Sequence, residues 1–201
     1  MRFFFGSMAH VGRFNTDPHP GNYMLLDDGR MAFIDFGNTV EVGDPELMRR
    51  AVMAAVHGDA ERFVTAATDL GYVRDAQRID REALLAQALQ VGDWYLQDRE
   101  LRIDSEYVAG VISALIDPRA MEGALHLIRQ LKVPPQEIWL RRVETSVLAV
   151  LGQLGATRNW HRIMLEILQG GEPATDLGVV ESEFWARRGP AVRPSRKSSP
   201  L

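Results

Sequence analysis

The sequence predicts a mainly α-helical domain that carries one small β-hairpin. From Asp44 to about Gly170, apolar residues recur at spacings of three and four, and a residue typical of helix N-termini precedes most of these apolar stripes. Earlier in the chain, two short apolar segments, residues 23–26 and 31–34, flank the turn tripeptide DDG at residues 27–29. That arrangement is typical of a hairpin. No internal repeat is visible, so we expect a single domain.

The composition excludes several classes of protein. The 201 residues are 46% hydrophobic and 25% charged, as in ordinary soluble domains, which excludes a wholly disordered or collagen-like chain. The absence of cysteine excludes disulfides, thiolate nucleophiles and cysteine-bound zinc. No apolar run approaches the roughly 18–20 residues that cross a bilayer, and the apolar residues 1–5 are too few for a signal peptide. We therefore expect a cytoplasmic protein.

Charge is distributed unevenly along the chain. The net charge is −4, although residues 187–201 hold five basic residues and no acidic one. The body is therefore acidic, which excludes nucleic acid as an expected partner. We predict that residues 171–201 form a disordered basic tail, because its end contains Pro, Ser and Gly without apolar periodicity. A solvated end is the simpler interpretation, and peripheral contact with an anionic membrane surface is the alternative.

The remaining elements follow in order along the chain. Residues 1–13 resemble the end of a buried helix, and residues 14–22 hold two prolines, a glycine and two asparagines, as in a rigid loop. The hairpin covers residues 23–34, and Asp-Phe-Gly follows at residues 35–37. Seven helices are predicted over the helical bundle of residues 44–170, beginning at Asp44, Asp59, Asp80, Asp104 or Ser105, Pro118, Pro134 and Asn159. The third should continue through Leu96 and the fifth to about Leu131.

Three residues form the constellation that carries chemistry: Asp17, Asn22 and Asp35. Phosphoryl transfer needs a carboxylate that orients the attacking hydroxyl or water, and oxygen ligands that hold Mg²⁺ against nucleotide phosphates. The hairpin runs out and back over about five residues each way, so Asp35 should return beside Asn22 at a strand spacing of roughly 5 Å. An amide oxygen and a carboxylate that close can share one hard cation.

Other residues support this loop. Pro18 and Pro20 stiffen the segment that holds Asp17, and Gly37 can adopt a positive φ where the chain turns away. His19 has two interpretations: it steers the loop or a phosphate, or it is an ordinary surface histidine.

These motifs resemble the UbiB/AarF family of atypical protein-kinase-like proteins. The similar segments are FNTDPHPGN at residues 14–22, LLDDGR at residues 25–30 and FIDFG at residues 33–37. Three later features also resemble that family's helical lobe: residues 46–50, the helix break at 58–60 and the prolines at 134–135. The resemblance covers about residues 1–170 and implies the C-terminal lobe of a protein-kinase-like (α+β) fold.

The resemblance also implies a function. According to the resemblance, Asp17 matches the catalytic aspartate, and Asn22 and Asp35 match the two Mg²⁺ ligands. His19 and Gly37 would support the loop and the nucleotide. The family is implicated in biosynthesis of isoprenoid quinones such as ubiquinone, and in ATP binding or hydrolysis linked to lipids at membranes. The expected function is therefore that of an atypical kinase or ATPase that uses ATP and Mg²⁺.

The chain departs from the family's pattern in two ways. Asn15 replaces the histidine of the loop, and we expect its amide to make the hydrogen bonds of that scaffold residue. The N-terminal lobe has no counterpart, because the only lysines are Lys132 and Lys197. We expect a C-terminal lobe with little activity alone. An uncovered apolar face at residues 1–5, Phe14 and Phe36 should then contact an N-lobe-bearing protein, a second copy of the chain or a membrane surface. The alternative is that residues 1–8 fold back and close this face.

Two other functions remain open. An aminoglycoside-phosphotransferase-like small-molecule kinase has a similar loop, HGDxHPGN, followed by IDFG, although Pro18 and the helices after Gly37 favour the UbiB/AarF resemblance. A non-catalytic, truncated remnant that acts as an interaction module is favoured by the missing lysine. Without that cation, the phosphates lose charge neutralisation where negative charge is concentrated.

Overall fold

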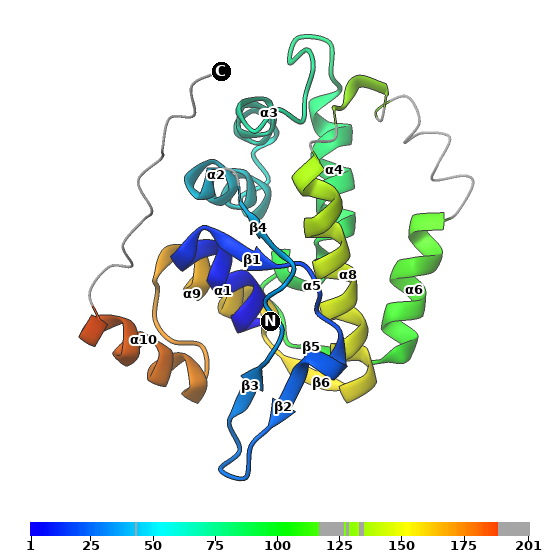
Figure 1. Cartoon of the computed structure of the whole chain (residues 1–201). Helices are drawn as coiled ribbons and strands as arrows, with labels where there is room; N and C mark the ends of the chain where they lie inside the picture. The colour runs from blue at the N-terminus through cyan, green and yellow to red at the C-terminus, as the bar shows by residue number, and fades with distance from the viewer. Residues whose placement is uncertain (43, 117–126, 128, 133–134, 189–201) are drawn as a thin grey trace.

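The computed structural model describes residues 1–188 with the exceptions of 43, 117–126, 128 and 133–134 (Figure 1). These residues are mainly helical, with small antiparallel sheets of two strands each, which confirms the predicted fold class. The helices are α1 (Arg2–Val11), α2 (Pro45–Val56), α3 (Ala60–Asp69), α4 (Arg81–Val91), α5 (Asp93–Leu96), α6 (Ser105–Ile116), α8 (Pro135–Leu154), α9 (Trp160–Gln169) and α10 (Asp176–Arg188), with one 3-10 helix, η1 (Pro20–Asn22). The strands are β1 (Arg13–Asn15), β2 (Tyr23–Leu25), β3 (Met31–Phe33), β4 (Thr39–Glu41), β5 (Leu101–Ile103) and β6 (Ala156–Arg158).

The predicted hairpin is confirmed. Strands β2 and β3 pair antiparallel, with Tyr23 opposite Phe33. Gly29 turns the chain with a φ of 83°, a conformation that L side chains rarely adopt. At the base of the hairpin, the N–H of Ile34 donates to the carbonyl oxygen of Asn22 at 3.1 Å. The hairpin therefore returns the chain to Asn22 one residue before Asp35.

The sheet of β1 and β4 leaves no signal in the sequence. Its register places Arg13 opposite Glu41 and Asn15 opposite Thr39. Each strand has three residues, too few for an alternating apolar pattern to be recognised. The pairing matters for the site because it brings the two ends of residues 16–38 together.

Five helices begin where the sequence predicts, including α6, at whose start Oδ1 of Asp104 accepts the N–H of Tyr107 at 3.0 Å. The side chains of Asp44, Asp59, Asp80 and Asn159 each accept a hydrogen bond from a backbone N–H of the following turn. Pro45 is the first residue of α2. These contacts satisfy N–H groups that have no partner inside a helix, and they confirm the predicted starts of α2, α3, α4, α6 and α9.

The third predicted helix is wrong in its extent. It was expected to continue through Leu96, but α4 ends at Val91 and the short α5 follows Gly92. A Cβ atom at Gly92 would lie 2.5 Å from Cδ1 of Leu96, so the close packing at this break depends on glycine. The fifth predicted helix falls mostly on residues outside the described part of the chain.

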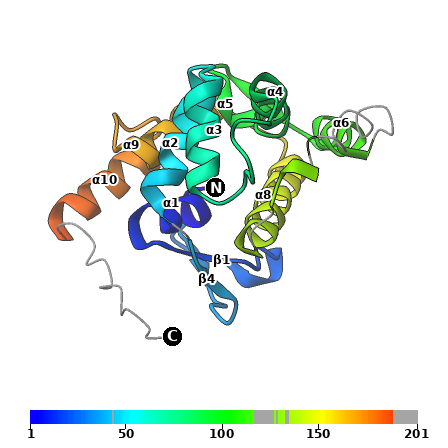
Figure 2. The ribbon, with the colours of Figure 1, turned by 90° about the horizontal axis from the view of Figure 1, so that it is seen from above.

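The largest apolar core lies between α1, α5, α8 and α9. Phe5, Trp94, Val143 and Trp160, one from each of these helices, are buried in it. The rings of Trp94 and Trp160 meet edge to face with centroids 6.3 Å apart. Helix α6 packs on α8, and α10 lies at the opposite edge of the molecule (Figure 2). This core fixes the position of α8, which runs past the loop of residues 14–22.

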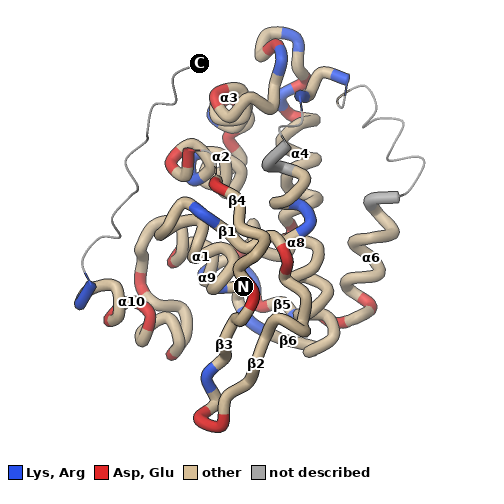
Figure 3. The backbone as a smooth tube through the Cα atoms, in the orientation of Figure 1, with Lys and Arg blue, Asp and Glu red and all other residues tan. Residues whose placement is uncertain are grey.

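Basic and acidic side chains are interspersed over the helices and at the hairpin (Figure 3). At the hairpin, Arg30 pairs with Asp28 at 2.7 Å. Among the described residues, no helix combines the length and apolar character that crossing a bilayer requires.

The expectation of a disordered tail over residues 171–201 is wrong for residues 176–188, which form α10. Arg2 of α1 donates to both carboxylate oxygens of Glu166 on α9, at 2.6 and 2.7 Å, and to Glu181 on α10 at 3.0 Å. Arg2 lies 179 positions from Glu181 in the sequence, so composition alone could not reveal this contact. Residues 189–201 of the predicted tail lie outside the described residues.

The ion pair of Arg2 and Glu166 should stabilise the fold in a pH-dependent way. Burial opposes ionisation of Glu166, but hydrogen bonds from Arg2 and from the N–H of Ala174 outweigh it and lower the pKa of this carboxyl below 4.5. A lowered pKa stabilises the folded state above the unfolded pKa, and this stabilisation is lost as pH falls through the folded pKa. We expect Glu166→Gln to lower the free energy of unfolding by about 1–3 kcal/mol at neutral pH.

Urea unfolding at neutral and acidic pH measures this effect. The difference between the variant and the parent should shrink as the pH falls below 4.5. Glu183→Gln is a matched control, because Glu183 is exposed and lies 3.9 Å from its partner Arg187; it should change stability by less than about 0.5 kcal/mol. Equal effects of the two variants would contradict the stabilising role of the Arg2–Glu166 ion pair.

Candidate functional site

The amide of Asn15 holds the two halves of the candidate site together. Asn15 is buried, and its Oδ1 accepts the backbone N–H of Asp17 at 2.8 Å. Its Nδ2 donates to the backbone carbonyl of Asp35. One side chain thus fixes the backbone of the loop aspartate and of the Asp-Phe-Gly segment. The expected scaffold role of Asn15 in the loop is confirmed.

Thr16 ties the same two segments from the next position. Its backbone N–H donates to the carbonyl oxygen of Asn38 at 2.8 Å, and its hydroxyl donates to the same oxygen at 3.2 Å. Thr16 is 2% exposed, so these bonds form away from water, where leaving them unmade would be costly.

The carboxylate of Asp17 lies between two polar partners. Nδ2 of Asn22 donates to Oδ2 of Asp17 at 3.1 Å, and the guanidinium of Arg142 on α8 donates to Oδ1 at 3.1 Å. Asp17 retains 27% side-chain exposure, so the carboxylate is fixed but open to solvent. The structure therefore brings Asp17 and Asn22 into direct contact.

Asn22 and Asp35 are brought together through the hairpin base, where the N–H of Ile34 bonds the Asn22 carbonyl. Because Nδ2 of Asn22 points at Asp17, its amide oxygen is oriented away from that carboxylate. Oδ1 of Asp35 accepts the N–H of Gly37 at 2.8 Å, and no bond from a described residue engages Oδ2. These oxygens are hard ligands of the kind that Mg²⁺ prefers.

The donor set fits a cation that is shared with a ligand. Among the described residues, no group of three or more His, Asp or Glu side chains could hold a metal ion. Mg²⁺ commonly takes one or two protein ligands and completes its octahedron with water and phosphate oxygens. The pair of Asn22 and Asp35 matches that pattern.

His19 and Gly37 shape the backbone. Nδ1 of His19 accepts the N–H of Gly21 at 3.0 Å and caps η1, so the histidine supports the loop while its ring is exposed. Gly37 does not adopt a positive φ, so the chain turns away without using that conformational freedom. A Cβ there would meet Oδ1 of Asp35 at 3.1 Å, so the glycine permits the close approach of its own N–H to that carboxylate.

Two residues of the site escaped the sequence reasoning. Arg142 lies 125 positions from Asp17 in the chain, in a helix whose apolar stripe gives no reason to single it out. Tyr23 donates its hydroxyl to the carbonyl of Pro18 at 2.7 Å. Burial, and secondly the nearby Asp17 charge, raise the pKa of this phenol to about 12. Tyr23 is therefore protonated at neutral pH and braces the loop.

The expected apolar face at the N-terminus is mostly closed. Phe4, Phe5 and Phe14 are buried, and the ring of Phe3 stacks on Phe33 of the hairpin with centroids 3.7 Å apart. Phe36 remains 57% exposed. The apolar exposure thus lies at Phe36 and along the hairpin, and the expectation is wrong for the N-terminal helix because α1 packs against the core.

A loop aspartate, a hairpin and an Asp-Phe-Gly segment on a helical lobe define a protein-kinase-like C-terminal lobe. The fold is similar to that of Rv3197 from Mycobacterium tuberculosis, solved in complex with erythromycin, with a TM-score of 0.62 and 23% identity. The similarity covers 84% of this chain and 41% of that protein. At this identity it establishes the fold, which is kinase-like.

Sequence comparison finds similar proteins for the N-terminal third of the chain. Residues 1–67 match the ABC1 atypical kinase-like domain. Protein ACTIVITY OF BC1 COMPLEX KINASE 1 of Arabidopsis thaliana is 38% identical over 68 residues, covering 33% of this chain and 10% of that protein. An aarF domain-containing protein kinase of the same plant is 38% identical over 55 residues, covering 26% and 8%. The N-terminal third of the chain is therefore similar to ABC1 atypical kinase-like domains, in line with the resemblance to the UbiB/AarF family. It spans about a tenth or less of the length of these two relatives.

Removing the Asn15 amide should loosen the site. Asn15→Ala leaves a buried N–H of Asp17 and a carbonyl of Asp35 without this partner, so we expect a loss of about 1–3 kcal/mol in the free energy of unfolding. Faster hydrogen exchange at the Asp17 amide should accompany it. Asn38→Ala is the control, because the Asn38 side chain is exposed and only its backbone carbonyl holds Thr16. Unchanged exchange at Asp17 would refute the bridging role.

Proposed function

We propose that this chain provides the phosphate-and-metal half of an ATP-dependent phosphoryl-transfer or ATP-hydrolysing site. One observation carries the proposal: Asn15 bonds both Asp17 and Asp35, while Asn22 bonds the Asp17 carboxylate. The three residues expected from the resemblance are thus held in one connected network. The match of residues 1–67 to the ABC1 atypical kinase-like domain supports a kinase-like function, and ATP and Mg²⁺ enter as parts of this proposal.

In this proposal each residue has a separate task. The Asp17 carboxylate, fixed on both oxygens and partly open to solvent, orients the attacking hydroxyl or water by accepting its hydrogen bond. The amide oxygen of Asn22 and the carboxylate of Asp35 hold Mg²⁺, which neutralises phosphate charge when it is bound. Gly37 and His19 keep the backbone of the two segments in place.

Arg142 adds a positive charge beside the attacking position. Its guanidinium lies 3.1 Å from Asp17 and 5.9 Å from the centroid of the Trp139 ring, and its side chain is about half exposed. In the proposal it positions the Asp17 carboxylate and faces the charge that develops on the transferred phosphoryl group.

The acceptor is proposed from the family resemblance. A link to isoprenoid quinone or lipid biosynthesis, with peripheral contact at a membrane, is proposed from the resemblance to the UbiB/AarF family. The exposed side chains of Leu25, Ile34 and Phe36 favour a second role as an interaction surface. An N-lobe-bearing protein or a second copy of this chain is the proposed partner there.

Manganese binding tests the metal ligands directly. We expect Mn²⁺ to broaden NMR signals around Asn22 and Asp35, with weak affinity because only two protein ligands are present. Asp35→Asn should reduce the broadening strongly. Asp28→Asn is a matched control at the hairpin turn, where the carboxylate pairs with Arg30. Broadening that persists in Asp35→Asn and disappears in Asp28→Asn would overturn the assignment.

Turnover tests the catalytic role. No lysine precedes Lys132 in the chain, so the lysine expected to neutralise nucleotide phosphates in the family has no counterpart beside the hairpin in the isolated chain. We expect the isolated chain to hydrolyse ATP far below the roughly 1–100 s⁻¹ of typical kinases. Any residual turnover should vanish in Asp17→Ala and persist in Asp28→Ala. Turnover within the kinase range that Asp17→Ala abolishes would show that this chain is a complete catalyst.

A further inference from the structure

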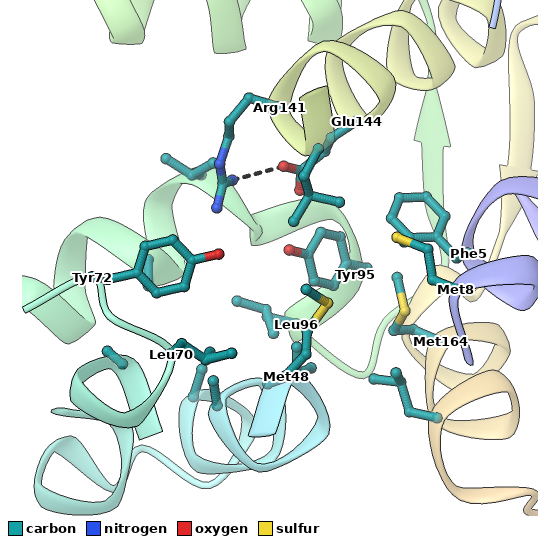
Figure 4. Close-up of a pocket in the computed structure, with 18 of the residues that line it drawn as sticks. Phe5, Met8, Met48, Leu70, Tyr72, Tyr95, Leu96, Arg141, Glu144 and Met164 are labelled. Atoms are coloured by element: carbon teal, nitrogen blue, oxygen red, sulfur yellow. Dashed lines mark hydrogen bonds and ion pairs between the residues drawn. The ribbon is translucent and has the colours of Figure 1, made fainter. Parts of the chain in front are cut away.

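A large apolar cavity lies among the helices, away from the loop of residues 14–37. Its volume is about 500 Å³, and its wall is formed by α1, α2, α3, α4, α5, α6, α8 and α9 with segments that connect them (Figure 4). None of its described wall residues comes from residues 14–37. Ligand pockets in proteins commonly measure roughly 300–1,000 Å³ and have mostly apolar walls. The cavity therefore has the dimensions of a small-molecule site.

Most of the wall is apolar, and several of its side chains can adapt their shape to a ligand. Three methionines face the cavity, Met8 from α1, Met48 from α2 and Met164 from α9 (Figure 4). Leu70 and Leu96 add branched apolar surface. Methionine is unbranched and polarizable and adapts to irregular ligands. An apolar molecule would recover dispersion contacts that an open cavity leaves unmade.

One side of the wall is polar. Arg141 and Glu144 of α8 form an ion pair at 2.7 Å, and Glu144 is only 7% exposed. The hydroxyl groups of Tyr72 and Tyr95 point into the same space (Figure 4). Hydrogen-bond donors and acceptors are thus concentrated at one side of an otherwise apolar chamber.

Among the described wall residues, the charged side chains are Arg141 and Glu144, and they pair with each other. A ligand head group with its own net charge would add an unbalanced charge beside a paired arginine and glutamate, at a cost in desolvation. A neutral hydroxyl or carbonyl can instead accept from Arg141 or a tyrosine hydroxyl, and a hydroxyl can donate to Glu144. The wall therefore selects for a neutral, hydrogen-bonding head group.

We propose that this cavity is a binding site for a neutral amphiphile, with an apolar body among the methionines and a single hydroxyl or carbonyl at Arg141, Glu144 and the two tyrosines. The proposal is independent of phosphoryl transfer at Asp17. Helix α8 serves both regions: Arg142 contacts Asp17, while Arg141 and Glu144 face the cavity.

Decanol is a suitable probe, because it combines an alkyl body with one neutral hydroxyl. In protein labelled with carbon-13 at the methionine methyl groups, titration with decanol should shift the signals of Met8, Met48 and Met164. Met24 and Met31 lie on the hairpin, outside the cavity wall, and should not move. Decanoate at neutral pH should bind at least about tenfold more weakly, because its carboxylate brings an unbalanced charge.

Two variants of α4 separate binding from folding. Ala88 lines the cavity, so Ala88→Leu should fill part of it and weaken decanol binding. Ala83 is exposed on the same helix, so Ala83→Leu should leave binding unchanged. Unchanged Met24 and Met31 signals would show that each variant is folded. Tyr72→Phe keeps the shape and removes one hydroxyl, and we expect decanol to bind it about 3–10-fold more weakly.

Several results would overturn the proposal. One is that the signals of Met8, Met48 and Met164 do not shift up to the solubility limit of decanol. Others are that all methionine signals shift equally, or that decanol binds Ala88→Leu as tightly as the parent. Binding of decanoate as tight as that of decanol would exclude the neutral head group. Failure of the Mn²⁺ and ATP experiments at Asp17 and Asp35 would leave the cavity proposal standing, because those experiments report on the other side of α8.

Discussion

The buried amide of Asn15 is the contact on which the candidate site depends. A single side chain satisfies the N–H of Asp17 and the carbonyl of Asp35, and both groups would otherwise lose hydrogen bonds in a place closed to water. The pairing of β1 with β4 brings these segments close enough for one amide to reach both. The carboxylates that the sequence singles out are therefore positioned by a neutral residue.

Helix α8 connects this network to the rest of the lobe. Consecutive residues of an α-helix point about 100° apart, so neighbours in sequence face different surroundings. Val143 is fully buried in the core, Arg142 reaches the Asp17 carboxylate, and Arg141 faces the apolar cavity. A displacement of α8 would therefore move side chains at the loop of residues 14–22 and at the cavity together, because the same helix contacts both.

Helix α10 shows how ion pairs can order a segment whose composition resembles a tail. Arg2 bonds Glu166 and Glu181 in a largely enclosed position, and His10 stacks on Trp185. The large apolar side chains of α10, among them Leu177 and Val180, remain largely exposed, so burial contributes little to its order. Its order depends on partners in α1 and α9.

The sequence by itself determined what short-range chemistry controls. Asp44, Asp59, Asp80 and Asn159 begin helices because their side chains cap nearby N–H groups, and Gly29 turns the hairpin because it tolerates a positive φ. The motif spacing also identified Asp17, Asn22 and Asp35. Only the tertiary structure decided the partners that come from distant segments: the pairing of β1 with β4, the reach of Arg142 to Asp17, the docking of α10 and the cavity. Contacts of this kind depend on how whole elements pack, and local sequence carries no record of that packing.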